Sequence, residues 1–206
     1  MKITKLSRQK RKEDRFSLYI DGSFAAGLSA ETVARFNLRE GKEINLEQLH
    51  NAIFEEEKQH ALNYALRLLS YRNRSQKEIL ERLKKRGCPE NVTNLIIEEL
   101  KASGLVDDKK FAIAFAQDRL NFAKKGKRFI FVELLRKGIP KSDVEEALKK
   151  INDETKVAQK LIDKYQKRYT RLEPKQRRKK LHDLLLRRGF TFKTINEVLE
   201  AHPNTT

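Results

Sequence analysis

Residues 103–140 read SGLVDDKKFAIAFAQDRLNFAKKGKRFIFVELLRKGIP, and this stretch decides how the rest of the chain is interpreted. It ends in LLRKG, closed by Gly138. The phrase has a counterpart upstream in LKKRG, closed by Gly87, and another downstream in LLRRG, closed by Gly189. The three glycines lie 51 residues apart, twice over. Self-similarity at a period of this size indicates a repeat protein, so we predict three structural repeats.

Each repeat reads as three helices. Apolar residues recur at spacings of three and four, the period of an amphipathic helix. The repeated glycine ends the middle helix of each repeat in a left-handed conformation. Capping signals begin several of the helices, and we assign them to Asn45, Ser75, Asp107 and Ser142. The segment from the first helix to the repeated glycine is five residues longer in the third repeat than in the second. We place these extra residues in a turn at 168–174.

A different pattern precedes the repeats. Apolar residues alternate on both sides of Asp21 and Gly22, which predicts a β-hairpin, and Ser29 caps a short helix. The predicted fold is therefore mainly α, with three tandem helix-turn-helix-like repeats in a curved, elongated array behind a small N-terminal β-hairpin module. We divide the chain into this module (1–44), a linking helix (45–59) and repeats at 60–106, 107–151 and 152–206.

The charge is strongly basic and unevenly distributed. The 46 Lys and Arg residues exceed the 29 Asp and Glu residues, for a net charge of +17. Residues 1–59 are nearly balanced, whereas residues 152–206 carry 14 basic and 7 acidic side chains. Such a field favours a polyanionic partner, either nucleic acid or a protein bound to it. The competing interpretation is a soluble protein with a basic bias.

The sequence favours no catalytic chemistry. Its four histidines are scattered, it has one cysteine, and no phosphate-binding loop or hydrolase motif is present. Asp107 and Asp108 precede an apolar helix, so helix capping explains them better than the metal-binding carboxylates of a nuclease. We therefore expect no enzyme, no cofactor and no metal. The chain lacks an apolar run long enough for a membrane span and a signal-peptide core at its start, so we expect a cytoplasmic protein without membrane contact.

Basic clusters are the candidate binding sites. Three of them fall at the C-terminal ends of the middle helices, where cations also complement the helix dipole. Two more fall in turns and at the starts of middle helices, where the dipole disfavours them and like charges repel. A polyanion would convert that repulsion into affinity. The candidate residues are Lys84, Lys85, Arg86, Lys124, Lys125, Lys127, Arg128, Arg136, Lys137, Arg177, Arg178, Lys179, Lys180, Arg187 and Arg188.

The third helices argue against reading of a DNA groove. They carry acidic side chains that repel phosphates, namely Glu98, Glu99, Glu145 and Glu146. We therefore do not expect sequence-specific recognition of a major groove. Four aromatic residues, Tyr64, Phe115, Phe122 and Tyr165, have the chemistry to stack on bases, but their helical spacing assigns most of them to the core.

The central stretch resembles the core signature of the RecX family of bacterial regulators. The matching residues are Gly104, Leu105, Val106, Asp107, Asp108, Lys109, Lys110, Phe111, Ala112, Arg119, Gly126, Arg128, Leu134, Leu135, Arg136, Lys137, Gly138 and Ile139. Residues 66–87 and the hairpin at Asp21 fit as well. The likeness covers nearly the whole chain and weakens in the third repeat.

The resemblance implies a function that the residues alone do not. RecX proteins bind in the groove of the filament that the recombinase RecA forms on DNA, and they inhibit RecA ATPase, strand exchange and coprotease activity. The implied partner is this RecA nucleoprotein filament, and we expect a monomer that also contacts single- and double-stranded DNA directly. The alternative is a non-enzymatic DNA-binding module that affects RecA by competition for DNA. The resemblance supplies no catalytic residues.

Overall fold

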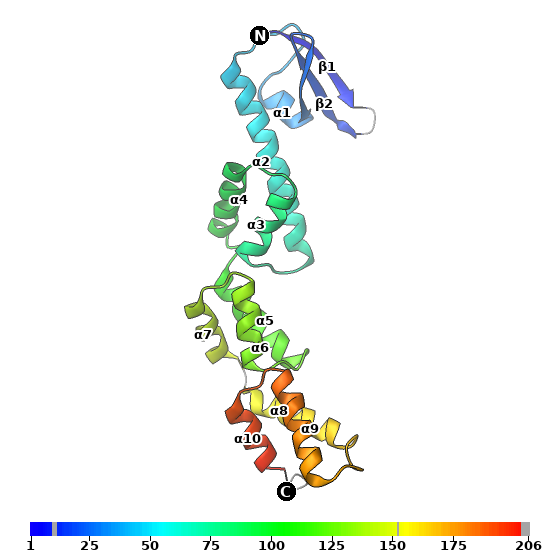
Figure 1. Cartoon of the computed structure of the whole chain (residues 1–206). Coiled ribbons are helices and arrows are strands. Elements are labelled where there is room, and N and C mark those ends of the chain that lie inside the picture. The colour runs from blue at the N-terminus through cyan, green and yellow to red at the C-terminus, as the bar shows by residue number, and fades with distance from the viewer. Residues whose placement is uncertain (10–11, 152, 203–206) are drawn as a thin grey trace. The chain divides into compact units, whose positions relative to one another are not determined.

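The structure, a computed structural model, describes residues 1–9, 12–151 and 153–202. The described chain is mainly helical and includes one three-stranded antiparallel sheet (Figure 1). It forms two compact units. Unit 1 consists of Met1–Arg72 and Ile79–Ser103, and unit 2 consists of Asn73–Glu78 and Gly104–Thr206.

The sheet of unit 1 has the order β1 (Ile3–Gln9), β2 (Lys12–Ile20), β3 (Ser23–Ser29). The turn between β2 and β3 contains Asp21 and Gly22, with φ values of 48° and 86°. A two-residue hairpin turn of this kind needs both central residues in the left-handed region, which Asp and Gly tolerate. The predicted hairpin is confirmed, and β1 adds a third strand to it.

One face of the sheet packs on two helices, α1 (Ala30–Arg35) and α2 (Leu46–Tyr71). The buried residues of this core are Ile3, Leu18, Ile20, Leu28, Leu38, Ile44 and Ala52. Asn45 and Gln48 form the predicted capping box at the start of α2. The boundary that we place at residue 59 lies inside this helix. The helix continues for 26 residues because no glycine or proline interrupts it.

Eight further helices complete the described chain. They are α3 (Gln76–Lys85), α4 (Glu90–Ala102), α5 (Asp108–Asn121), α6 (Lys127–Arg136), α7 (Lys141–Lys150), α8 (Glu154–Gln166), α9 (Pro174–Arg187) and α10 (Phe192–Glu200). With α2, they form the three predicted three-helix repeats, whose middle helices are α3, α6 and α9. Gly87, Gly138 and Gly189 follow these helices with φ values of 82°, 85° and 77°. The predicted left-handed stops are therefore confirmed.

Two local predictions are wrong. We assign the cap of the third helix of repeat 2 to Ser142, but α7 begins at Lys141, after Pro140, without a side-chain cap. Pro140 is the N-cap residue, with an extended ψ of 144°, so the helix begins directly after it. We also place the extra residues of repeat 3 in a turn. Most of them lengthen the middle helix instead, since α9 has 14 residues and α6 has 10.

A buried carboxylate joins the sheet of unit 1 to α2. Glu56 of α2 is 5% exposed. It accepts hydrogen bonds from the Ser29 backbone N–H (2.8 Å) and the Thr32 hydroxyl (2.7 Å). Arg15 of β2 and His60 lie 3.2 and 2.7 Å from its other oxygen. Burial raises the pKa of Glu56, but the hydrogen bonds from Ser29 and Thr32 and the charge of Arg15 together lower it below its ordinary value.

We predict that Glu56 stabilises unit 1 above about pH 5 and stops doing so in acid. Its folded-state pKa lies below the ordinary value of 4.5, so its contribution is present above that value and disappears as the pH falls through the folded pKa. At neutral pH, Glu56→Gln should lower the free energy of unfolding by about 1–3 kcal/mol. Urea unfolding followed by circular dichroism at a series of pH values measures both effects.

The difference between the wild type and Glu56→Gln should shrink as the pH falls. Glu55→Gln is the matched control, because Glu55 pairs with the exposed Arg35 and with no other described residue. A difference that stays constant down to about pH 3 would contradict the role assigned to Glu56.

Unit 2 has one hydrophobic core that draws on repeats 2 and 3. Buried side chains from α5 to α10 form a single cluster, including Leu120, Ile130, Leu134, Ile162, Leu181 and Phe190. The start of α6 approaches the end of α9 so closely that a Cβ on Gly126 would lie 2.3 Å from the Phe190 Cα atom. A Cβ on Gly189 would lie 2.6 Å from the Phe129 backbone nitrogen. Glycine is required here by backbone packing.

This packing predicts a difference between two left-handed glycines of unit 2. Gly104 has a φ of 71° and open space where a Cβ would stand, so Gly104→Ala should cost only about 1–2 kcal/mol of unfolding free energy. Gly189→Ala adds a backbone clash and should cost about 2–5 kcal/mol. Urea unfolding of the two variants measures the difference, and equal losses would show that the close approach does not limit stability.

Candidate functional site

The middle helices of unit 2 meet end to end. The Gly126 and Arg128 N–H groups at the start of α6 donate to the carbonyls of Arg188 and Gly189 at the end of α9, at 2.9 and 3.0 Å. Similarly, the Ser75 hydroxyl, in the residues that begin α3, donates to the Lys137 carbonyl at the end of α6 (2.8 Å). Helix ends leave N–H and C=O groups without intrahelical partners, and these contacts pair them.

An acidic residue supports each of these contacts. Asp108, the first residue of α5, accepts from the Gln76 N–H (2.8 Å), and Glu154, the first residue of α8, accepts from the Lys127 N–H (2.6 Å). Both acids stand four residues before a buried alanine, Ala112 or Ala158, so the spacing could have revealed their equivalence. Sequence reasoning missed this role because the acceptors and donors are far apart along the chain.

Asp107 caps α5, as predicted. Its carboxylate accepts from the Lys110 N–H (2.9 Å), and this hydrogen bond lowers the pKa of Asp107. Within the described residues, no group of histidine, cysteine or acidic side chains has the arrangement of a metal site. Burial raises the pKa of Cys88, which keeps its thiol protonated. None of the described helices is both long and apolar enough to cross a membrane.

The cation directly before each repeated glycine interacts within the protein. We call Arg86, Lys137 and Arg188 the inner cations. Arg86 lies over the Tyr64 ring (4.4 Å), and Lys137 pairs with Glu78 (2.6 Å) beside the Phe115 ring. Arg188 donates to the carbonyls of Ala123 and Lys124, at 3.2 and 3.4 Å.

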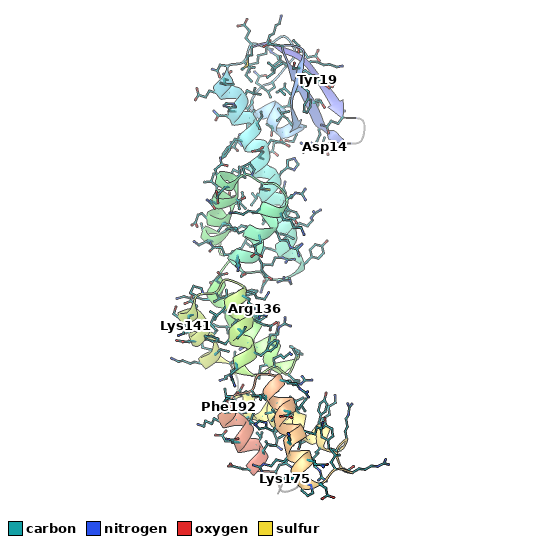
Figure 2. The ribbon with its side chains drawn as sticks, in the orientation of Figure 1. Asp14, Tyr19, Arg136, Lys141, Lys175 and Phe192 are labelled. Atoms are coloured by element: carbon teal, nitrogen blue, oxygen red, sulfur yellow. The ribbon has the colours of Figure 1, made fainter. Side chains whose placement is uncertain are left out.

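The cation two residues before each glycine is different. We call Lys85, Arg136 and Arg187 the outer cations. All three are exposed, and in the described part of the chain none of their charged groups forms a hydrogen bond or ion pair. Figure 2 labels Arg136, at the C-terminal end of α6. The same position in three repeats therefore presents an unneutralised charge to solvent.

The basic turn at residues 124–128 is partly organised by aromatic rings. Lys125 lies 3.9 Å from the centre of the Phe129 ring, and Arg128 lies 4.8 Å from that of Phe192. Lys124 has a left-handed φ of 54°, and its amine donates to the Asn121 carbonyl. Lys127 is half-buried. No acidic side chain among the described residues forms an ion pair with these four cations, so the turn keeps its positive charge.

The basic cluster of repeat 3 divides into structural and exposed members. Arg177 donates to the carbonyls of Tyr169, Thr170 and Leu172, which closes the turn before α9. Arg178 is half-buried, whereas Lys179 and Lys180 are exposed. We expect this cluster in a turn and the first turn of a helix, but α9 begins at Pro174, so residues 177–180 lie further inside the helix. In repeat 1, Lys84 pairs with Glu90 (3.0 Å).

Three of the four aromatic candidates are partly buried, and one is not. Tyr64, Phe115 and Tyr165 are half-buried. Phe122 is 81% exposed, although the helical spacing favoured a core position for most of these rings. It is the C-cap residue of α5.

Comparisons with known proteins identify the family. Family models for the RecX N-terminal domain and the first, second and third RecX three-helix domains match residues 1–45, 61–100, 107–148 and 152–199. The regulatory protein RecX of Bacillus velezensis is 34% identical over 96% of this chain and 76% of its own length. That of Clostridioides difficile is 34% identical over 96% of this chain and 93% of its own. The chain belongs to the RecX family.

Solved RecX structures share the fold. A crystal structure of regulatory protein RecX matches with a TM-score of 0.71 and 27% identity, over 97% of this chain and 98% of that one. A RecX crystal structure from Lactobacillus salivarius matches with a TM-score of 0.67 and 27% identity, over 71% of this chain and 97% of its own. RecX proteins are regulatory proteins. In this RecX chain, three residues of the motif have structural roles. Asp108 accepts a hydrogen bond from the Gln76 N–H, and neighbouring residues approach Gly126 and Gly138 too closely for a Cβ.

The inner and outer cations should differ in their effect on stability. Arg188→Gln removes donors from two backbone carbonyls and should lower the free energy of unfolding by about 1–3 kcal/mol. Arg187→Gln removes an exposed charge and should change it by less than about 0.5 kcal/mol. Urea unfolding of these two neighbouring variants provides a matched comparison. A larger loss for Arg187→Gln would mean that the outer cation stabilises the fold.

Proposed function

We propose that this protein binds the RecA–DNA filament in the cytoplasm and inhibits RecA activity in recombination and repair. Membership of the RecX family of regulatory proteins supports regulation. The resemblance set out above supplies RecA as the partner and ATPase, strand exchange and coprotease activity as the inhibited functions.

The repeated outer cation is the observation that carries the proposal. A repeat protein with an exposed charge at the same position of every repeat can contact a target that is itself repetitive, because each repeat meets an equivalent group. DNA phosphates are such groups, and acidic side chains on a protein filament are another set. The inner cations stabilise the ends of the middle helices, which positions the outer cations beside them.

A different set of cations supports a second function. The basic turn at residues 124–128 carries four cations without acidic partners, a feature that also favours free DNA. The protein would then reduce RecA activity only by occupying DNA. The two functions differ in whether the preformed filament is the target.

The test measures RecA ATPase on preformed filaments. The wild type should inhibit at amounts below those of RecA, and inhibition should persist when free DNA is added. The triple variant Lys85→Gln, Arg136→Gln, Arg187→Gln should inhibit at least about ten-fold less well, because three exposed contacts of about 0.5–1 kcal/mol each are lost. Circular dichroism checks that this variant is folded.

The matched control neutralises one lysine on the third helix of each repeat. Lys101, Lys141 and Lys193 each face an acidic residue of their own helix, at 3.0, 3.8 and 3.9 Å. Their triple Gln variant has the same net charge as the outer-cation variant and should inhibit like the wild type. If both triple variants lose the same amount of RecA inhibition, the outer cations act only through the net charge of the protein. Inhibition that vanishes with added free DNA would favour competition for DNA.

A further inference from the structure

Two exposed aromatic side chains occupy equivalent positions in repeats 1 and 2. Tyr71 ends α2 and is 79% exposed, and Phe122 follows α5 and is 81% exposed. They lie 51 residues apart, the period of the repeat, and each stands ten residues after a buried alanine, Ala61 or Ala112. One exposed aromatic residue needs no explanation, but the same exposed position in two repeats indicates a shared use.

Phe122 is held in a rigid setting. Its own N–H donates to the Asp118 carbonyl (2.9 Å), which keeps it on the last turn of α5. The next two carbonyls, of Ala123 and Lys124, accept hydrogen bonds from Arg188. The backbone on both sides of the ring is therefore fixed while the ring itself faces solvent. A preorganised aromatic ring loses little conformational entropy when a ligand packs on it.

The face of the Phe122 ring is free. Neighbouring aromatic rings are occupied by cations: Lys125 on Phe129, Arg128 on Phe192 and Arg119 on Phe115. No cation or second aromatic ring lies against Phe122 within the described residues. The basic turn that follows it, residues 124–128, has four cations and no acidic partner. An open aromatic face beside concentrated positive charge is the combination that binds single-stranded nucleic acid.

We propose that Phe122 stacks on an unpaired base of single-stranded nucleic acid while Lys125 and the other cations of residues 124–128 contact the adjoining phosphates. Tyr71 provides the equivalent base contact in repeat 1. This site has no base preference, because every base presents a π-face. This site rests on the proposed function, since it would contact the DNA component of the target.

An apolar socket on a partner protein is the competing occupant of Phe122. The charge around the ring disfavours it, since burying the ring in such a socket would also desolvate the neighbouring cations. The two occupants respond differently to substitution. A leucine still fills an apolar socket, whereas it lacks the π-face on which a base stacks.

The experiment measures binding of the full chain, without RecA, to fluorescein-labelled oligothymidylate and oligouridylate of about 20 nucleotides by anisotropy. Phe122→Leu should weaken binding about five-fold or more, and Phe122→Trp should preserve it. Neither should change the salt dependence, because the ring contacts no phosphate. Lys125→Gln should flatten the dependence of log K on log salt by about 0.7. Leu105→Ala, which changes another exposed apolar residue of unit 2, is the control and should bind like the wild type.

The chain contains no tryptophan, so Phe122→Trp also creates a unique fluorescent reporter. Stacking on a base should quench its emission on addition of either oligonucleotide, and quenching by one alone would assign the site to DNA or to RNA. Phe192→Trp replaces another exposed ring, which Arg128 already contacts, and should show less quenching. Emission unchanged at saturating oligonucleotide would overturn the proposal.

The outcomes separate this inference from the proposed function. Wild-type affinity of Phe122→Leu for both oligonucleotides, together with inhibition of RecA by the wild type, would overturn the stacking site and leave the proposed function intact. Loss of RecA inhibition in Phe122→Ala but not in Phe122→Leu would assign Phe122 to a protein socket instead. Stacking without any inhibition of RecA would support the site and overturn the proposed function.

Discussion

The end-to-end contact between middle helices is the constraint on which unit 2 depends. The first N–H groups of α6 donate to the last carbonyls of α9, and an acidic residue at the start of α8 completes the pairing. The two backbones come so close that only glycine fits at residues 126 and 189. Polar groups that a single helix would leave unsatisfied are thus paired between repeats.

Each middle helix ends in two neighbouring cations whose surroundings differ. The cation next to each glycine interacts with an aromatic ring, a carboxylate or backbone carbonyls. The cation one residue earlier is exposed, and its charged group has no such partner among the described residues. A cation with a partner in the protein and an exposed cation are therefore neighbours in each of the three repeats.

Much of the fold could be predicted because it depends on local signals. The glycine spacing, the apolar periodicity and the Asp-Gly turn each act over a few residues, and the repeats and the hairpin follow from them. The predicted cap at Ser142 and the predicted long turn in repeat 3 are wrong because the helices there begin earlier than we predict. One helix begins at Lys141, directly after Pro140, and the other begins at Pro174, both earlier than the polar residues around them suggest.

The candidate site could be predicted only as a set of residue types. The sequence by itself determined the repeat, the excess of positive charge and the positions of the basic clusters, since these are properties of residue order. Only the tertiary structure decided which cations remain free and which aromatic ring is exposed. The partners of Arg188 and Lys137 come from residues about 60 positions away, and no local pattern encodes contacts over that distance.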